Sequence, residues 1–180
     1  GLNIAHEAVD RHARGEGRDR VALRWLGRAA TRRNMTYRDL AQETDRFAGV
    51  LQRHGLRPGA RLFLLAGRVP ELYVAALGAL KAGLTVTPLF AAFGPEPIRM
   101  RMEIGSADVL VTTATLYRRK VAAWRGELAS LKAVIVLDDE APEDCLSWSA
   151  EMAAAQPVTG CAPTRPEDVA LIHFTSGTTG

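Results

Sequence analysis

Short apolar runs alternate along this chain with segments that have the length and patterning of helices. The expected strands are Val21–Leu26, Arg61–Ala66, Leu84–Leu89, Asp108–Thr112, Ala133–Leu137 and Val169–Phe174. Strands that alternate with helices pair in parallel through right-handed crossovers, and the helices cover the faces of the sheet. The pattern therefore predicts an α/β fold with a parallel-rich sheet flanked by helices.

The helix boundaries carry recognisable start and stop signals. Thr36 is a good N-cap, and Asp39 three residues later is a weaker form of the capping-box partner. Pro70 suits the first turn of a helix, and Gly83 suits its end. The expected helices are Asn3–Arg14, Thr36 to Gly55, Pro70–Ala82, Pro95–Gly105, Thr115–Leu131 and a minor one at Trp148–Ala155.

Bulk composition excludes several classes of protein. With 180 residues, the chain can bury one sizeable core but not two full domains. The net charge of +3 is spread along the sequence, so no nucleic-acid partner is expected. The longest apolar region, Glu71 to Phe90, contains Lys81, Gly83 and Pro88, which interrupt any membrane span.

The cysteines and histidines form no familiar metal or redox motif. Cys145 and Cys161 are not in a CxxC pair, and the four histidines form no HExxH. We therefore expect no metal site, and reduced cysteines in a cytoplasmic protein.

The last residues have the composition of a phosphate-binding loop. The run Val169–Phe174, expected to be a buried strand, leads into Thr175, Ser176, Gly177, Thr178, Thr179 and Gly180. Glycines let backbone N–H groups approach an anion, and hydroxyls add further donors. The loop lacks the Gly-Lys-Ser/Thr of a Walker A motif. On composition alone, an ordinary turn after a strand remains open.

As a string after a strand, Thr175–Gly180 resembles the phosphate loop of the AMP-forming acyl-CoA synthetases, in the adenylate-forming superfamily. Leu80-Lys81-Ala82-Gly83 with Pro88, and the stretch Phe90–Glu96, are similar to further signatures of that family. Asn3 to His12 resembles the start of bacterial acetate–CoA ligases. The resemblance implies that residues 1–180 are the N-terminal subdomain of an AMP-binding domain, truncated within the phosphate loop.

The resemblance also implies a reaction. The loop would cradle the β- and γ-phosphates of ATP, supplied with Mg²⁺, while a small carboxylic acid attacks the α-phosphate. CoA would then displace AMP from the acyl-adenylate. The catalytic residues of the family would lie beyond Gly180, so the 180-residue piece is expected to be inactive and to self-associate through bared apolar surface.

A basic run is a candidate contact for CoA. Tyr117 has the spacing of a core residue, which leaves Arg118, Arg119 and Lys120 turned toward solvent. From the residues alone, a solvated helix face is the favoured interpretation of these charges. The resemblance implies instead that Arg118 and Arg119 lie at the mouth of the CoA site, where a guanidinium suits a phosphate.

The stretch after the expected strand Leu84–Leu89 is the second candidate contact for CoA. Phe90 and Phe93 could be core residues at a strand-to-helix junction. By resemblance, Phe90, Ala91, Ala92 and Phe93 line the pocket for the adenine of CoA, where the small alanines let a flat base approach the backbone.

Two other functions stay open at this stage. An adenylation domain that loads a carrier protein would share the Leu80–Gly83 signature. The chain could also be a non-catalytic module, a natural truncation of such an enzyme that binds a nucleotide or a partner. Residues Pro-Lys directly after Gly180 in a longer reading frame would exclude this second alternative.

Overall fold

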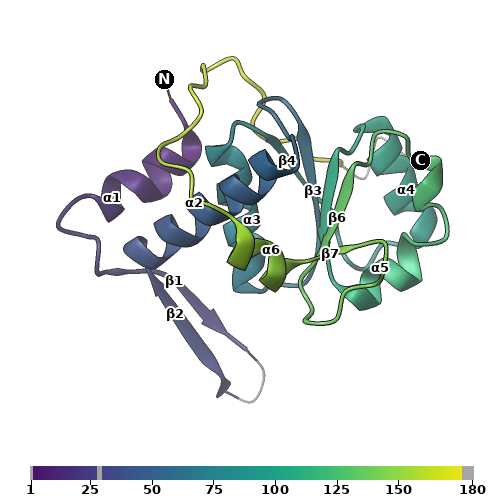
Figure 1. Ribbon diagram of the computed structural model, residues 1–180, viewed down its shortest axis with the longest axis horizontal. Helices are drawn as coiled ribbons and strands as arrows, with labels where there is room; N and C mark the ends of the chain where they lie inside the picture. The colour runs from purple at the N-terminus through teal and green to yellow at the C-terminus, as the bar shows by residue number, and fades with distance from the viewer. Residues whose placement is uncertain (1, 28–29, 176–180) are drawn as a thin grey trace.

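A computed structural model of the chain describes residues 2–27 and 30–175. It is an α/β structure, as predicted, and Figure 1 shows helices on both sides of a central sheet. The elements are η1 (His6–Asp10), α1 (Arg11–Ala13), β1 (Val21–Leu26), β2 (Arg32–Thr36), α2 (Tyr37–Arg53), β3 (Arg61–Leu65), α3 (Pro70–Lys81), β4 (Thr85–Pro88), α4 (Pro95–Ile104), β5 (Val109–Thr112), α5 (Ala114–Lys120), η3 (Arg125–Glu127), β6 (Ala133–Val136), β7 (Leu146–Ser147) and α6 (Trp148–Ala154).

The central sheet is parallel and has the strand order β4-β3-β5-β6-β7. Its register pairs Leu62 with Val109, and Val109 with Ala133. The four longer strands start and end within two residues of the predicted ranges. The short β7 was not predicted, because it consists of only two residues inside a polar loop.

Each face of the sheet packs against a different pair of helices (Figure 1). Leu62 and Leu64 of β3 pack with side chains of α2 and α3, such as Phe47. Phe63 and Leu65 point the other way, into a second cluster with α4 and α5. This alternation follows the two-residue period of a strand, and it buries both faces of the sheet.

Capping signals read from the sequence are present in the structure. The hydroxyl of Thr36 accepts from the N–H of Asp39, and the Asp39 carboxylate accepts from the N–H of Thr36. Gly83 follows the C-cap of α3 with φ +78°, a backbone conformation that residues with a Cβ rarely adopt. Within residues 2–27 and 30–175, no helix is both long enough and apolar enough to cross a membrane.

The predicted helix Thr115–Leu131 is wrong. Helix α5 ends at Lys120, and a turn and the short η3 replace its second half. At Val121 the backbone leaves the helical region, with φ −126°, while Val121, Trp124 and Leu128 are all buried in the cluster on this face. Packing of these side chains against the sheet therefore overrides their helical spacing.

The prediction of a buried strand at Val169–Phe174 is also wrong. Only Leu171 forms a bridge, parallel to Val86 of β4, and 57% of Leu171 and 63% of Val169 are exposed. Ala170 and Ile172 exchange backbone hydrogen bonds with Val86. The segment therefore returns to the sheet as predicted, but it lies at the edge, beside β4. Within the described residues, no strand pairs with the other side of this segment.

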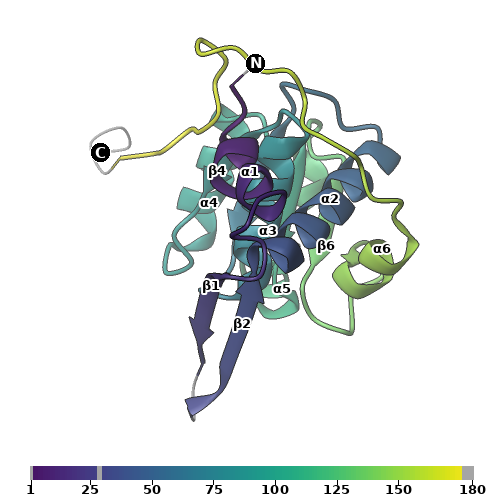
Figure 2. The same cartoon turned by 90° about the vertical axis from the view of Figure 1, so that its left-hand side faces the viewer.

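Strands β1 and β2 form a separate antiparallel hairpin. Figures 1 and 2 show that it projects from the body of the molecule. Strand β2 was not predicted because it reads Arg-Arg-Asn-Met-Thr, in which only Met35 is buried. Trp25 of β1 anchors the hairpin by donating to the carbonyl of Arg68 at 2.7 Å.

Candidate functional site

The predicted ligand segments meet at the carboxyl edge of the sheet. Phe90 follows β4, and α5 follows β5, so both begin where parallel strands end. The segment Val169–Thr175 runs parallel to β4 and brings Phe174 to the same edge. In open α/β sheets, ligands bind outside this edge.

The stretch Phe90–Phe93 forms a tight turn between β4 and α4. The N–H of Phe93 donates to the carbonyl of Phe90 at 3.0 Å, and their rings pack edge to face with centroids 5.4 Å apart. Phe90 is 65% exposed, Ala92 is also exposed, and Ala91 and Phe93 are half-buried. Phe90 is therefore not a core residue, whereas Phe93 lies against the core.

Helix α5 is tied directly to this turn. The ammonium of Lys120 donates to the carbonyls of Ala91 and Phe93, each at 2.6 Å. The prediction that Lys120 points to solvent is therefore wrong, because two backbone carbonyls draw the half-buried ammonium inward. The structure thus brings together the two segments predicted to contact CoA.

Arg118 and Arg119 are exposed on α5, as predicted. Neither guanidinium forms an ion pair or a hydrogen bond with another residue of the described ranges. Both side chains are therefore available to an external anion.

Arg101 is a residue of this edge that the sequence did not single out. It lies on α4, is 4% exposed, and places its guanidinium carbon 4.5 Å from the centroid of the Phe93 ring. The same carbon is 5.8 Å from the centroid of Phe174. The signal in the sequence was weak: an arginine next to Met102 and three residues after Ile98, both of which are fully buried.

The predicted phosphate loop is described only at its start. Thr175 is exposed at the carboxyl edge, directly after Phe174. Ser176, Gly177, Thr178, Thr179 and Gly180 lie outside the described residues. Their role in holding phosphates stays a prediction.

Helix α5 carries a buried tyrosine, Tyr117. The hydroxyl of Tyr117 donates to the carboxylate of Asp144. Burial, and then this carboxylate, raise the pKa of Tyr117 above its usual range. Burial also raises the pKa of the neighbouring Cys145 thiol to about 11, with the charge of Asp144 as a second cause. Both groups stay protonated at neutral pH, so neither is an activated nucleophile.

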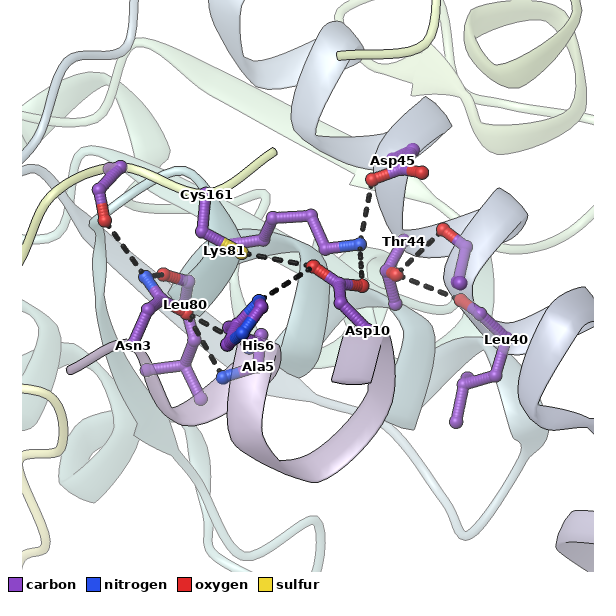
Figure 3. Close-up of polar contacts among 12 residues, drawn as sticks. Asn3, Ala5, His6, Asp10, Leu40, Thr44, Asp45, Leu80, Lys81 and Cys161 are labelled. Atoms are coloured by element: carbon purple, nitrogen blue, oxygen red, sulfur yellow. Dashed lines mark hydrogen bonds and ion pairs between the residues drawn. The ribbon is translucent and has the colours of Figure 1, made fainter. Parts of the chain in front are cut away.

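A buried polar cluster lies away from this edge, where α3 ends (Figure 3). The ammonium of Lys81 contacts Asp10 and Asp45 at 2.7 Å each, and the thiol of Cys161 donates to Asp10 at 3.1 Å. The cluster joins η1, α2, α3 and the chain near Cys161. The lysine of the Leu80–Gly83 signature therefore has a structural role in this chain.

Three residues of this cluster have side chains of the kinds that bind metal ions. The ligand atoms of His6, Asp10 and Cys161 lie within 4.8 Å of one another. Lys81 already neutralises Asp10, and a set with a thiol and an imidazole does not suit Mg²⁺, which prefers oxygen ligands. The trio is also remote from the carboxyl edge, so it does not fit an ion that enters with ATP.

A hollow of about 660 Å³ lies at the opposite, amino edge of the sheet. It is lined by residues at the starts of β3 and β4, such as Arg61 and Thr85, and by Leu2, Ile4 and Val169. Its position does not coincide with any segment predicted to bind a ligand.

Comparisons with known proteins match this chain to enzymes of one family. Residues 9–180 match the family of the AMP-binding enzymes. The chain is 36% identical, over 99% of its length, to an acetyl-coenzyme A synthetase of Bacillus subtilis strain 168, of which it covers 31%. It is 33% identical, over 99% of its length, to an acetyl-coenzyme A synthetase of Sodalis glossinidius, of which it covers 30%.

Solved structures agree with these matches. An acyl-CoA synthetase from Brucella canis superposes with a TM-score of 0.88 at 31% identity, over 99% of this chain and 32% of that one. An anthranilate CoA ligase, AuaEII, solved in complex with anthranoyl-AMP, superposes with a TM-score of 0.86 at 22% identity, over 99% of this chain and 33% of that one, and so supports the fold alone. The chain thus spans 30% to 33% of the length of these relatives.

Proposed function

The chain belongs to the AMP-binding enzymes, within the adenylate-forming acyl-CoA synthetases, and we propose that it is the N-terminal part of an ATP-dependent ligase of a short carboxylic acid and CoA. Residues 1–180 would form the N-terminal subdomain of its AMP-binding domain. Its relatives named acetyl-coenzyme A synthetases support acetate, or a similarly short acid, as the substrate.

The proposed reaction has two balanced steps. A carboxylate oxygen of the acid attacks the α-phosphorus of ATP, and pyrophosphate leaves, which gives an acyl-adenylate. The sulfur of CoA then attacks the acyl carbonyl, loses its proton, and AMP leaves with the former carboxylate oxygen. Such steps depend on positioning and on preorganised donors for developing charge.

The residues of this chain would bind and orient the substrates. Thr175 to Gly180 would donate to the β- and γ-phosphates of ATP through backbone N–H groups and hydroxyls. Phe90, Ala91, Ala92 and Phe93 would form a wall for the adenine of CoA. Arg118 and Arg119 would attract its phosphates. ATP would arrive with Mg²⁺, and we assign no described residue to that ion.

The observation that carries the proposal is the meeting of the predicted segments at one edge. Lys120 connects the helix of Arg118 to the turn of Phe93, and Arg101 lies between Phe93 and Phe174. A nucleotide held at Thr175 and a CoA held at the turn would therefore approach one another. We also propose that the enzyme works in the cytoplasm, where both ATP and CoA are present.

Pyrophosphate exchange by a longer protein that carries this chain tests the proposal. Acetate and propionate should support exchange of labelled pyrophosphate into ATP, and CoA should then yield a thioester. Exchange with amino acids alone would instead favour a domain that loads a carrier protein. The absence of exchange with every acid, in a protein that does bind nucleotide, would favour a non-catalytic binding module.

The 180-residue chain provides the matched control. It should fold without catalysing exchange, because the remaining two-thirds of the relatives' length has no counterpart in it. Thioester formation by the purified 180-residue chain would contradict this expectation.

A further inference from the structure

Arg101 is a buried cation whose surroundings call for an explanation. It is 4% exposed, and its Nη1 donates to the carbonyl of Pro97 at 2.9 Å. A buried charge is costly unless polar or aromatic partners compensate for its lost hydration. The rings of Phe93 and Phe174 supply part of this compensation, with the guanidinium carbon 4.5 Å and 5.8 Å from their centroids.

The two rings belong to segments that are distant in the sequence and assigned to different substrates. Phe93 closes the turn predicted to contact CoA, whereas Phe174 immediately precedes the predicted phosphate loop. Their common contact with Arg101 means that a shift of the guanidinium changes the packing of both rings. Helix α4, which carries Arg101, also packs Ile98 and Met102 into the core, so the arginine extends from a rigid element.

Lys120 holds the same turn in a different way. Its ammonium donates to the carbonyls of Ala91 and Phe93, and its hydrogen bonds within the described residues reach no other segment. Lys120 is therefore a natural comparison for Arg101, since one residue contacts a single ligand segment and the other contacts both.

We propose that Arg101 is a positioning residue that couples the Phe90–Phe93 turn to the segment leading into the phosphate loop. The effect of this coupling on catalysis rests on the proposed function, whereas the packing of Arg101 against both segments does not depend on it. A planar guanidinium can lie against aromatic rings, whereas the compact, strongly hydrated ammonium of a lysine does so less well. Arg101→Lys should therefore preserve the charge and lose much of the coupling.

Hydrogen exchange of the 180-residue chain tests the structural part without any activity. Arg101→Met and Arg101→Lys should speed exchange, roughly tenfold for the loss of one cation–π contact, both in residues 90–94 and in residues 171–175. Lys120→Met should do so in residues 90–94 alone. Unchanged exchange in residues 171–175 of both Arg101 variants would overturn the proposal.

Phe93→Leu keeps the test decisive if the Arg101 variants do not fold. This substitution leaves the buried cation in place and removes one of its two rings. Through Arg101, it should also speed hydrogen exchange at residues 171–175, which are far from Phe93 in the sequence. An increase in the rate of hydrogen exchange that is confined to residues 90–94 would contradict the coupling.

A longer protein with ligase activity tests the catalytic part. Arg101→Lys should raise the KM for both ATP and CoA, by roughly tenfold each, whereas Lys120→Met should act mainly on the KM for CoA. In a Phe174→Leu background, Arg101→Lys should have little further effect on the KM for ATP. Additive effects, or a change in one KM alone, would refute the coupling. Absence of activity in the wild type would instead refute the proposed function. The hydrogen-exchange results would then decide whether Arg101 couples the two segments.

Discussion

The ammonium of Lys81 lies 2.7 Å from a carboxylate oxygen of Asp10, and both side chains are almost completely buried. Asp45 contacts the same ammonium at 2.7 Å and is more exposed (Figure 3). This pairing fixes the helix at the start of the chain against α2 and α3. It also explains why a buried lysine is present at the end of a largely apolar helix.

Lys81→Met should destabilise the fold strongly. It leaves the buried carboxylate of Asp10 without its cation, and breaking a buried pair in this way costs about 3–5 kcal/mol. Urea unfolding of the 180-residue chain gives the change in free energy. Lys132→Met is the matched control, because Lys132 pairs with Asp108 at 2.9 Å on the surface and such pairs contribute at most about 1 kcal/mol. Equal losses in the two variants would contradict this interpretation of the cluster.

Gly83→Ala should destabilise the fold more than Gly55→Ala. Both glycines have positive φ, +78° and +70°, so an added Cβ costs about 1–2 kcal/mol at either position. At Gly83 that Cβ would also lie 2.9 Å from the Cβ of Ala162, whereas nothing lies within 4 Å at Gly55. Thermal and urea unfolding should show an extra loss of about 1 kcal/mol or more at Gly83. Equal losses would mean that the neighbouring loop moves away freely.

The sequence predicted elements well where local patterns decide them. The apolar run before Thr112 predicted β5, in which all four residues are buried, and Thr36 with Asp39 marked the start of α2. Local patterns failed where several arrangements bury the same side chains. Val121 and Trp124 are buried by a turn as well as by a helix. An apolar run such as Val169–Phe174 does not by itself distinguish a central strand from an edge segment.

The sequence predicted which segments form the candidate site, but not how they contact each other. Resemblance indicated Phe90–Phe93 and Arg118, whereas the contacts of Arg101 and Lys120 depend on residues far away in the chain. Charged side chains are expected on the surface, so a single sequence favours solvent for all of them. Buried cations such as Lys81 became visible only once their partners were placed in space.

Acid should weaken the contact between α2 and α6. Glu151 lies 2.7 Å from Nε2 of His54 and also accepts from Arg53. Burial alone would raise the pKa of Glu151, but the hydrogen bonds from His54 and Arg53 outweigh it and lower that pKa. At pH values near the two pKa values of Glu151, this carboxyl group therefore binds a proton more readily in the unfolded chain than in the folded one. The contribution is therefore complete above the unfolded pKa of about 4.3, and is lost as the pH falls through the folded value.

Glu151→Gln isolates this contribution. The difference in unfolding free energy between the wild type and this variant should shrink between pH 6 and pH 3, measured by urea titration at each pH. Glu103→Gln, at an exposed position of α4, should show no such trend. A difference that stays constant over this range would exclude Glu151 as a source of acid sensitivity.

Self-association of the 180-residue chain should depend on its open edge. Val169 and Leu171 are 63% and 57% exposed beside β4, and Leu2 and Ile4 add 60% and 53% exposed apolar side chains. Exposed apolar surface along an edge segment favours association. Val169→Lys with Leu171→Lys should shift sedimentation velocity profiles toward the monomer. Leu26→Lys, on the separate hairpin, is the control, and an equal effect there would point to general solubility instead.

Arg118 and Arg119 should contribute to binding CoA rather than ATP. Both are exposed on α5, which Lys120 holds against the Phe90–Phe93 turn. In a longer protein with ligase activity, replacing either arginine with Ala should raise the KM for CoA roughly tenfold, for the loss of one charge-assisted contact of ~1.5 kcal/mol. Pyrophosphate exchange should change little, because adenylation does not require CoA.

Two comparisons make this last prediction specific. Arg57→Ala removes an exposed arginine from the loop before β3, at the opposite edge of the sheet, and should leave the KM for CoA unaltered. Dephospho-CoA should discriminate less between the wild type and the Arg118 and Arg119 variants, if the contact is to the 3′-phosphate of CoA. An unchanged KM for CoA in both single variants and in the double variant would identify these arginines as ordinary solvated surface charges, since a bound phosphate would then have lost two guanidinium groups without effect.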